Sequence, residues 1–500
     1  MKVYNTLSQE VQDFTPINDK QVKMYVCGPT VYDYPHLGHA RCYMTWDIVA
    51  RYLRFKGYDL TYVRNVTDVD DKIINKAKAV GTTPKNIAET YYEEFKDAMH
   101  GLNIADPDIE PRATENIQEM IDIINTLVDK GYAYSRNGDV YYRVNKYKKY
   151  GRLSKQNIDD LEAGARVETS EKKEDPLDFA LWKAVKTEDE LGWDSPWGKG
   201  RPGWHIECSA MVKRYLGDTI DIHAGGHDLI FPHHENERAQ SEAAFNKPFV
   251  KYWMHNGFVL VNEEKMSKSL GNYVTIKDIL DKYDANTIRL FVLTSNYRMP
   301  IEFTDEGLRS AKAGVRRLKN AYNDIKNILG EDKIQEARDL LNIVIDDLAK
   351  TDRLPFYNID TMQHLEEKIP AEFMENIIKV IKDFINAMDD DFNTSKALAV
   401  LFDIANSAQR HKDLNNLEIC AFCVALLLGL SDILGFNLTK VEEPTAILTN
   451  QLMEVILSVR NTARDQKNWE ISDKIRDELA RIGITVKDHK DRATTWEFKD

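Results

Sequence analysis

The chain has 500 residues, 43% of them apolar, which is enough for about three domains that each bury a core. With 67 basic and 81 acidic residues the formal net charge is −14, so any contact with nucleic acid must come from local patches. The longest uncharged apolar stretch, 419–431, is shorter than the roughly 20 residues that cross a bilayer, which argues against a membrane-spanning segment.

The first ten residues contain neither the apolar segment nor the cleavage site of a secretory signal, so we expect a cytoplasmic protein. Five widely spread cysteines do not form a disulfide framework. We therefore expect reduced thiols, some of them bound to metal. For the oligomeric state, a monomer is the default expectation.

The first half of the chain predicts a doubly wound, Rossmann-like α/β domain. A buried strand over 22–27 is broken by Gly28 and Pro29, a helix follows over 36–55, and a second strand follows over 59–66. In such a sheet ligands bind at the carboxyl ends of the strands, so the loop after Cys27 is a candidate site.

Residues 114–199 interrupt this pattern with one helix and short Tyr-rich strands, which predicts a domain inserted between 1–113 and 200–300. The second half of the sheet begins after the insertion, and residues 221–225 form the end of its first predicted strand. It continues with a helix over Pro232–Phe245 that has proline in its first turn.

In residues 301–440 the apolar residues recur mainly with the period of an α-helix, which predicts a helical bundle. Within it, 331–368 holds ten acids against five bases and is interpreted as a solvated extra hairpin. Residues 441–500 predict a small C-terminal module, with helices over 445–466 and 472–482 and a strand over 484–486.

Two histidines, His36 and His39, stand at the start of the helix that follows the first strand. A helix N-terminus carries free N–H groups and a partial positive charge, which suit a phosphate, and the imidazoles add donors. Gly38 allows a base or ribose to approach the backbone closely. The alternative is an ordinary helix start with two exposed histidines.

A second cationic element, Lys265–Ser269, lies between an apolar strand over 257–261 and a helix. Lys265 and Lys268 on a mobile loop could stabilise the charge that develops on a triphosphate. The alternative is a solvated basic turn, which the co-occurrence with His36–His39 disfavours.

Together the two strings resemble the signature motifs of class I aminoacyl-tRNA synthetases, with Leu37 in place of the usual isoleucine. The resemblance implies that His36 and His39 stabilise the α-phosphate as a carboxylate attacks it. It also implies that Lys265 and Lys268 hold the leaving pyrophosphate.

A metal site is a further candidate. His233 and Glu237 are four residues apart on one predicted helix face, and Cys27 and Cys208 are the thiolates that could complete a tetrahedral zinc site at the rim of the sheet. The spacing alone leaves open that both cysteines are small buried hydrophobes.

The chain also resembles the cysteinyl-tRNA synthetase family, closely over about 3–320. The strings that carry the resemblance are Tyr25–Asp33, Asn65–Lys72, Pro202–Met211, Gly225–Glu237 and Asp389–Thr394.

This resemblance implies ATP-dependent ligation of L-cysteine to tRNA(Cys), with Mg²⁺ accompanying ATP. It implies one Zn²⁺ per chain, held by Cys27, Cys208, His233 and Glu237. It further implies an amino-acid pocket lined by Thr67 and Trp204, and an ATP site that includes Gly38, Asp228 and Lys268.

Zinc would explain how cysteine is separated from serine, because a thiol of pKa about 8.5 ionises readily on the metal whereas a hydroxyl does not. Such a site needs no proofreading. The inserted segment 114–199 is correspondingly short and polar for a hydrolytic editing domain.

Cys420 and Cys423 are spaced as in a helix and are expected in a helix core. Trp469 and Trp496 have two interpretations: they either stack on unpaired RNA bases or pack in their small module. Five further histidines crowd the proposed site, and none is singled out: His205, His223, His227, His234 and His255.

Two rival functions remain at this stage. The cysteine ligases of mycothiol synthesis share the catalytic half but pass cysteine to an amino sugar, and they should lack an RNA-reading tail. A catalytically inactive, zinc-dependent RNA-binding or regulatory protein is the other rival, and it would not need both signature motifs.

Overall fold

The computed structural model describes the following residues: 1–157, 173–187, 190–261, 264–265, 273–351, 370–440, 446–488 and 494–498. The chain forms two compact units, Met1–Thr439 and Lys440–Asp500. Within the described part of the chain, none of the helices combines the length and the apolar composition that a bilayer crossing requires.

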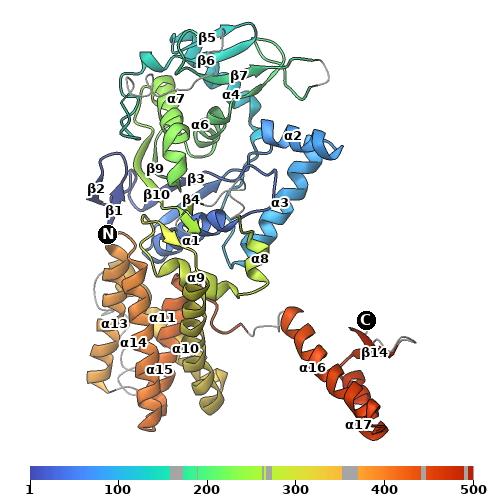
Figure 1. The fold of residues 1–500 in the computed structure, drawn as a ribbon. Coiled ribbons are helices and arrows are strands. Elements are labelled where there is room, and N and C mark those ends of the chain that lie inside the picture. Colours follow the sequence, from blue (N-terminus) through green and yellow to red (C-terminus); the bar gives the residue numbers. More distant parts are fainter. Residues whose placement is uncertain are drawn as a thin grey trace. The chain divides into compact units, whose positions relative to one another are not determined.

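Four parallel strands form the central sheet of the first unit, in the order β10-β9-β3-β4 (Figure 1). Their bounds are β3 Gln21–Val26, β4 Asp59–Arg64, β9 Ile220–Gly226 and β10 Val250–Asn256. Val26 pairs with Arg64 on one side and Ala224 on the other, so the carboxyl ends meet at one edge. This confirms the predicted doubly wound, Rossmann-like class.

Alternate residues of β3 face opposite sides of the sheet. Met24 and Val26 share a core with α1 (Leu37–Phe55), whereas Tyr25 and Cys27 share one with α6 (Trp204–Tyr215). The strand thereby points the Cys27 thiol toward the helix that carries Cys208.

A second, antiparallel sheet in the order β5-β6-β7-β8 lies between β4 and β9 in the sequence. The elements of this segment are α2 Asp71–Val80, α3 Pro84–Gly101, α4 Ile117–Asp129, β5 Ala133–Arg136, β6 Asp139–Tyr142, β7 Phe179–Ala184 and β8 Gly200–Pro202. Its core is continuous with apolar residues of α6 and α7 (Glu235–Phe245), which anchors it beside the site.

The helix predicted over Pro232–Phe245 is present. Its regular part is α7, Glu235–Phe245, and the wider helical turn Ile230–His234 leads directly into it. Phe231, which precedes the predicted start, is the one residue of that turn outside helical dihedral angles (φ −137°, ψ 133°). Proline disfavours the α conformation in the residue before it, so the helical conformation begins at Pro232, as expected.

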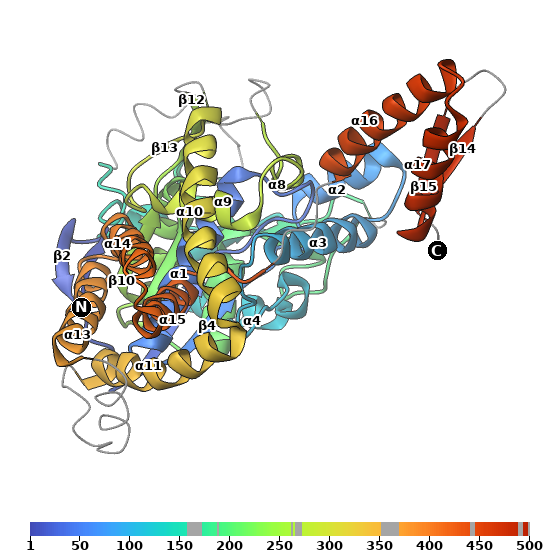
Figure 2. The same ribbon diagram turned by 90° about the horizontal axis from the view of Figure 1, so that it is seen from below.

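The remaining elements of the first unit form two small sheets, β1-β2 and β12-β11-β13, and the helical bundle (Figures 1 and 2). They are β1 Lys2–Asn5, β2 Glu10–Asp13, β11 Val259–Val261, β12 Glu264–Lys265, α8 Ile276–Leu280, α9 Ala285–Leu293, β13 Ile301–Glu302, α10 Asp305–Leu329, α11 Glu331–Thr351, α13 Ala371–Asp389, α14 Thr394–Asp413 and α15 Leu417–Ile433. Cys420 and Cys423 lie buried in α15, as expected.

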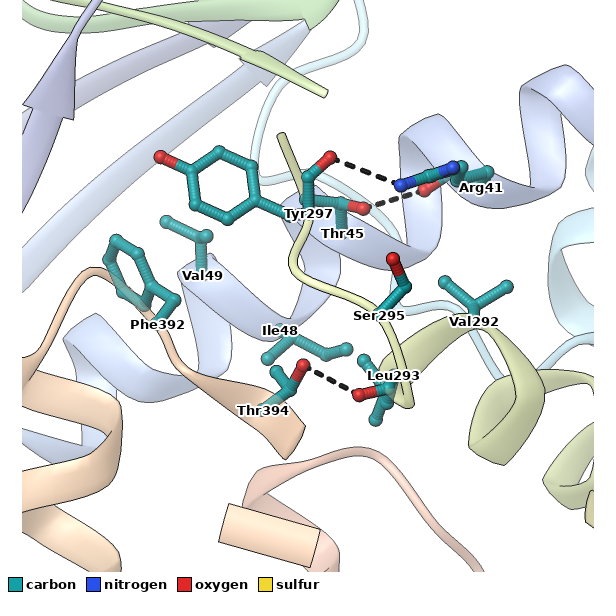
Figure 3. A pocket seen from close by; sticks show the side chains of 10 residues that line it. All are labelled: Arg41, Thr45, Ile48, Val49, Val292, Leu293, Ser295, Tyr297, Phe392 and Thr394. Atoms are coloured by element: carbon teal, nitrogen blue, oxygen red, sulfur yellow. Dashed lines mark hydrogen bonds between the residues drawn. The ribbon is translucent and has the colours of Figure 1, made fainter. Parts of the chain in front are cut away.

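Helix α1 and the bundle are both tied to main-chain carbonyls at and just after the end of α9, as Figure 3 shows. Arg41 of α1 donates to the Tyr297 carbonyl (3.3 Å), and Thr394 of α14 donates to the Leu293 carbonyl (2.8 Å). A small pocket remains between these groups. Helices α1 and α14 are therefore held against the same short segment.

The prediction that 331–368 is a solvated hairpin is wrong for its first part. Helix α11 packs on α15, and Leu341, Val344 and Leu348 are buried. These side chains recur at three- and four-residue spacing, so an acidic outer face masked an apolar inner one. Residues 352–369 lie outside the described part of the chain.

The second unit contains α16 Ala446–Asp465, α17 Trp469–Arg481, and the antiparallel strands β14 Ile484–Asp488 and β15 Thr494–Phe498. Helix α17 begins three residues before the predicted 472, because Asn468 caps it by accepting from the Ile471 N–H (3.3 Å).

Candidate active site and metal centre

Two thiols from distant parts of the sequence meet at the carboxyl edge of the central sheet. Cys27 follows β3, Cys208 lies on α6, and their Sγ atoms are 3.8 Å apart. Only 4% and 1% of these residues is exposed, so both thiols face each other rather than solvent.

His233 and Glu237 bring two further donors to the thiols. His233 Nε2 lies 3.0 Å from Glu237 Oε1 and 3.5 Å from Cys208 Sγ. Glu237 Oε1 lies 3.6 Å from Cys27 Sγ. The four predicted ligands thus form a buried cluster in which all donor atoms lie within 4.8 Å of one another.

The spacing of these donors fits a tetrahedral metal site. With Zn–S bonds of about 2.3 Å and Zn–N bonds of about 2.0 Å, a tetrahedron places two sulfurs about 3.8 Å apart and sulfur and nitrogen about 3.5 Å apart. The Cys27–Cys208 and Cys208–His233 separations, 3.8 and 3.5 Å, agree with both values. Two thiolates, an imidazole and a carboxylate suit zinc.

The electrostatics of the cluster favour the ligating forms of two of its members. Burial opposes ionisation of Glu237, but His223 and His233 outweigh it and lower the carboxyl pKa to about 2. Burial also opposes ionisation of Cys208, but hydrogen bonds with Cys27 and His233 lower its pKa to about 6. Cys208 and Glu237 are therefore poised to bind a cation.

A second ligand set overlaps the first, and sequence reasoning did not find it. His223 and His234 join the same Cys27 and Glu237, with His223 Nε2 2.8 Å from Glu237 Oε2 and His234 Nε2 3.2 Å from Cys27 Sγ. This set holds only one thiol. It also places two imidazoles where they can orient the ligands of the first set.

The outer histidines extend this arrangement. His205 Nδ1 lies 2.9 Å from His233 Nδ1, and His255 Nε2 lies 2.7 Å from His234 Nδ1. Of the five histidines that the sequence left unassigned, four contact the cluster directly or through one neighbour. His227 lies on the exposed turn after β9.

A pocket of about 570 Å³ opens beside the cluster and collects most of the other predicted residues. Its lining includes Cys27, His36, Gly38, His39, Trp204 and Asp228. Trp204 stacks on His233 with ring centroids 4.1 Å apart, which joins the pocket to the metal ligands.

Thr67 does not line this pocket. It is buried, and its hydroxyl donates to Glu207 Oε2 (2.8 Å). Burial raises the pKa of Glu207 well above its ordinary value, which favours the neutral form of this carboxyl. Glu207 carried no separate signal in the sequence because it directly precedes Cys208.

The start of α1 is organised by its histidines. His36 is the N-cap and accepts from the Gly38 N–H (3.0 Å), while His39 Nδ1 accepts from the His36 N–H (3.2 Å). The two rings stack with centroids 3.9 Å apart. Burial and the neighbouring His36 lower the pKa of His39 well below its ordinary value, so it serves as a neutral hydrogen-bonding group.

Asn65 is a second residue that sequence reasoning missed. Its Oδ1 accepts from the Gly28 N–H (2.8 Å) and lies 3.8 Å from Cys208 Sγ. A Cβ on Gly28 would lie 1.4 Å from the Asn65 carbonyl oxygen, so the chain needs glycine there to leave the sheet.

The cationic loop is described only at its start. Lys265 ends β12, which pairs with β11 next to Val259 in the pocket wall, and its side chain is not described. Lys268 lies outside the described residues.

Three family models match this chain. They are tRNA synthetases class I (C) catalytic domain over 13–313, DALR domain over 383–439, and cysteinyl-tRNA ligase anticodon binding domain over 451–496. The first alone covers more than half of the sequence.

Curated relatives match over the whole length. A cysteine–tRNA ligase of Geobacillus thermodenitrificans is 46% identical over 500 residues, covering 99% of each chain. One of Fusobacterium nucleatum is 47% identical over 512 residues, again covering 99% of both.

Solved structures of lower identity share the fold. A Mycobacterium tuberculosis methionyl-tRNA synthetase bound to methionyl-adenylate is 15% identical with a TM-score of 0.56, covering 83% of this chain and 90% of that one. A LeuRS of Agrobacterium radiobacter in a ternary complex is 11% identical with a TM-score of 0.59, covering 85% and 86%.

Proposed function

Because the chain belongs to the cysteinyl-tRNA synthetase family, we propose that it selects its amino acid through a zinc–thiolate bond during the ATP-dependent ligation of L-cysteine to tRNA(Cys). Cys27, Cys208, His233 and Glu237 would hold the ion. Bound zinc supplies a Lewis acid that stabilises the substrate thiolate, which serine cannot match.

In the first step the carboxylate of cysteine attacks the α-phosphorus of ATP, and pyrophosphate leaves with Mg²⁺. His36 and His39 at the positive end of α1 donate hydrogen bonds to the α-phosphate oxygens, whose negative charge rises in the transition state. Lys265 and Lys268 hold the leaving pyrophosphate, while Gly38 and Asp228 position the nucleoside.

In the second step a hydroxyl of the terminal tRNA ribose attacks the carbonyl carbon of the adenylate, and AMP leaves. Trp204 stacks on His233 and lines the pocket, where its ring would pack against the amino acid. Thr67, whose hydroxyl donates to Glu207, would help to shape the amino-acid pocket. Positioning and electrostatics carry both steps, and no covalent enzyme intermediate is required.

For the whole protein we propose a catalytic domain over 1–113 and 200–300, an inserted domain over 114–199, a helical domain over 301–440 and an anticodon-reading module over 441–500. The match of the anticodon model to 451–496 supports tRNA rather than an amino sugar as the acceptor. We further propose that the protein acts as a cytoplasmic monomer.

The observation that carries the proposal is the agreement of the donor spacings with a tetrahedral site that opens into the nucleotide pocket. The test is aminoacylation of tRNA(Cys) by purified protein, with zinc determined on the same sample. We expect cysteinyl-tRNA with about one zinc per chain, and no seryl-tRNA.

Controls separate the rival functions. Cysteine-dependent ATP consumption with an amino-sugar acceptor, without charging of tRNA, would identify a small-molecule ligase. Failure of cysteine-dependent pyrophosphate exchange would identify an inactive binding protein. Full charging by metal-free protein would contradict the zinc assignment.

A further inference from the structure

One wall of the nucleotide pocket is formed where β10 leads into β11. Residues 256–259 all line the pocket, and two of them, Phe258 and Val259, carry large apolar side chains. Apolar side chains in a ligand pocket suit the flat base of ATP, which is the least polar part of the nucleotide. The position of this wall, residues 256–259, should therefore affect how tightly ATP binds.

A second stretch of chain, which we call the support segment (296–299), holds the wall through its backbone. The Gly257 N–H donates to the Tyr297 carbonyl (2.8 Å), and the Ile301 N–H just beyond the segment donates to the Phe258 carbonyl (2.9 Å). A Cβ on Gly257 would lie 2.4 Å from the Met299 carbonyl oxygen, so the two backbones are in direct contact. A shift of the support segment would therefore displace the wall.

A buried arginine of α1 binds the wall and the support segment together. Arg41 is 1% exposed. Its guanidinium donates to the carbonyls of Phe258 (2.7 Å), Tyr297 (3.3 Å) and Met299. Figure 3 shows the Tyr297 carbonyl facing Arg41. A planar group with five N–H donors can serve several carbonyls at once, which an ammonium group on one nitrogen cannot do in this arrangement.

A buried carboxylate of the helical domain binds the side chains of the same segment. Asp391 lies between α13 and α14 and is 5% exposed. Its Oδ1 accepts from the Tyr4 N–H (2.7 Å) and the Tyr297 hydroxyl (2.9 Å), and its Oδ2 accepts from Arg298 Nε (2.8 Å). Three donors thus replace the water that this carboxylate loses on burial. Arg298 is further fixed because its guanidinium lies over the Tyr4 ring at 4.2 Å.

The backbone around Asp391 is strained. Asp391 and Phe392 both have the left-handed conformation, with φ of 54° and 53°, although neither is glycine. Such conformations cost free energy and persist where the surrounding contacts determine them, which is common at functional positions. Here the Phe392 ring packs near Tyr52 and Tyr297, with ring centroids 6.0 and 6.5 Å apart. The strained turn directs the Asp391 carboxylate toward the support segment.

The two preceding aspartates make different contacts. Asp389 accepts from the Tyr52 hydroxyl (2.7 Å), and Asp390 is exposed and pairs with Lys396 (3.2 Å). Among the contacts of the described residues, Asp391 alone of the three bonds the support segment. A general joint between the helical domain and α1 is therefore available without Asp391.

We propose that Arg41 and Asp391 are positioning residues for ATP, which fix the support segment and through it the wall of the nucleotide pocket. Neither is among the described residues that line the pocket, so both act through the chain between them and the nucleotide. The inference rests on the proposed function. It adds to that function a residue of the helical domain, outside the 13–313 match of the catalytic model.

The first test is Asp391→Asn, which keeps the shape of the side chain but offers one acceptor oxygen in place of two. The KM for ATP in cysteine-dependent pyrophosphate exchange should rise about tenfold, with the KM for cysteine and the zinc content unchanged. Calorimetric affinity for α,β-methylene-ATP, which cannot react, should fall by the same factor. A purely structural role would lower the active fraction, and hence kcat, at an unchanged KM for ATP.

Two further variants test the path of the effect. Arg41→Lys keeps the positive charge but loses the fork of donors, so it should also weaken binding of the ATP analogue by about tenfold. Arg298→Gln removes the partner of Asp391 Oδ2. Because both side chains act through one contact, the double variant Asp391→Asn/Arg298→Gln should bind the analogue about as well as Asp391→Asn alone.

The matched control is Asp390→Asn, the same change at the exposed neighbour, and it should leave the affinity for the ATP analogue unchanged. Wild-type affinity in both Asp391→Asn and Arg41→Lys would overturn the proposal. An equal loss in Asp390→Asn, or an equal rise in the KM for cysteine, would also overturn it. A wild-type protein that binds the analogue but fails in cysteine-dependent exchange would instead overturn the proposed function.

Discussion

The metal cluster and the C-terminal unit use their side chains in opposite ways. In the cluster, ionisable groups are removed from water and bonded to one another, since His223, His233 and Glu237 are almost completely buried. In the C-terminal unit, large apolar groups remain at the surface, with Val455 and Ile482 62% and 70% exposed.

This difference determines which substitutions each region tolerates. A buried charge is stable only beside its partners, so each residue of the cluster constrains the others. The core of the C-terminal unit is small, formed by Met453, Leu457, Leu479 and Ile484. Single changes should therefore abolish chemistry in the first region, and should alter stability or RNA affinity in the second.

The largest effect is expected from Cys208→Ser. A serine hydroxyl is a poor zinc ligand, so the variant should lose its metal, and kcat/KM for cysteine in pyrophosphate exchange should fall at least about 100-fold. The KM for ATP should change little, because the ATP-binding residues are separate. Cys420→Ser, the same change in the buried core of α15, is the control and should retain zinc.

A second comparison distinguishes the two overlapping ligand sets. His233→Gln should remove a ligand and release zinc to a chelator. His234→Gln should only remove a supporting contact and weaken zinc affinity by about 10- to 100-fold. The reverse order of zinc release would assign the metal to the set that contains His223 and His234.

The residues that the sequence predicted best are those whose chemistry is tied to a local element. Cys27 follows a recognisable buried strand, and His36 and His39 begin a recognisable helix. The overlapping set was not predictable, because His223 and His234 meet Cys27 only once β9 pairs with β3 and the turn Ile230–His234 follows β9 at the same edge. The hydrophobic periodicity of a sequence describes a single helix or strand and gives no distance between two of them.

Net charge misled the interpretation of one segment. It suggested that Glu331–Thr351 is solvated, although its inner face packs on α15. The hydrogen bond from Thr67 to Glu207 spans 140 residues, so no local pattern could have predicted it.

Within the C-terminal unit, Arg460→Met should have the largest effect. Arg460 is buried and donates to both oxygens of Asp488 (2.8 Å each), which ties α16 to β14. Loss of this partly buried pair should destabilise the unit by about 1 to 3 kcal/mol. Hydrogen exchange should rise in 446–488 while cysteine activation is unchanged. Slowed activation would show that the two units are not independent.

Trp469→Ala should separate the two interpretations of the exposed tryptophan. Trp469 is 57% exposed, whereas Trp496 packs against the core of the unit. If Trp469 stacks on an unpaired base, the KM for tRNA should rise about tenfold, with pyrophosphate exchange unchanged. Trp469→Phe should preserve most of the affinity. An unchanged KM in the alanine variant would reject stacking.

The smallest effect is expected from pH acting on Asp488. Hydrogen bonds from Arg460 hold the pKa of this carboxyl well below its usual range, against the opposing effect of burial. A lowered folded-state pKa adds stability above the unfolded value of about 3.9, and that stability is lost as the pH falls further. At pH 6 the wild-type unit should therefore exchange amide hydrogens more slowly than Asp488→Asn protein. The difference should begin to narrow below about pH 4, where the unfolded carboxylate starts to bind a proton, and should narrow further as the pH falls toward the lowered folded-state pKa. A difference that stays constant from about pH 4 to about pH 2 would assign the effect to packing.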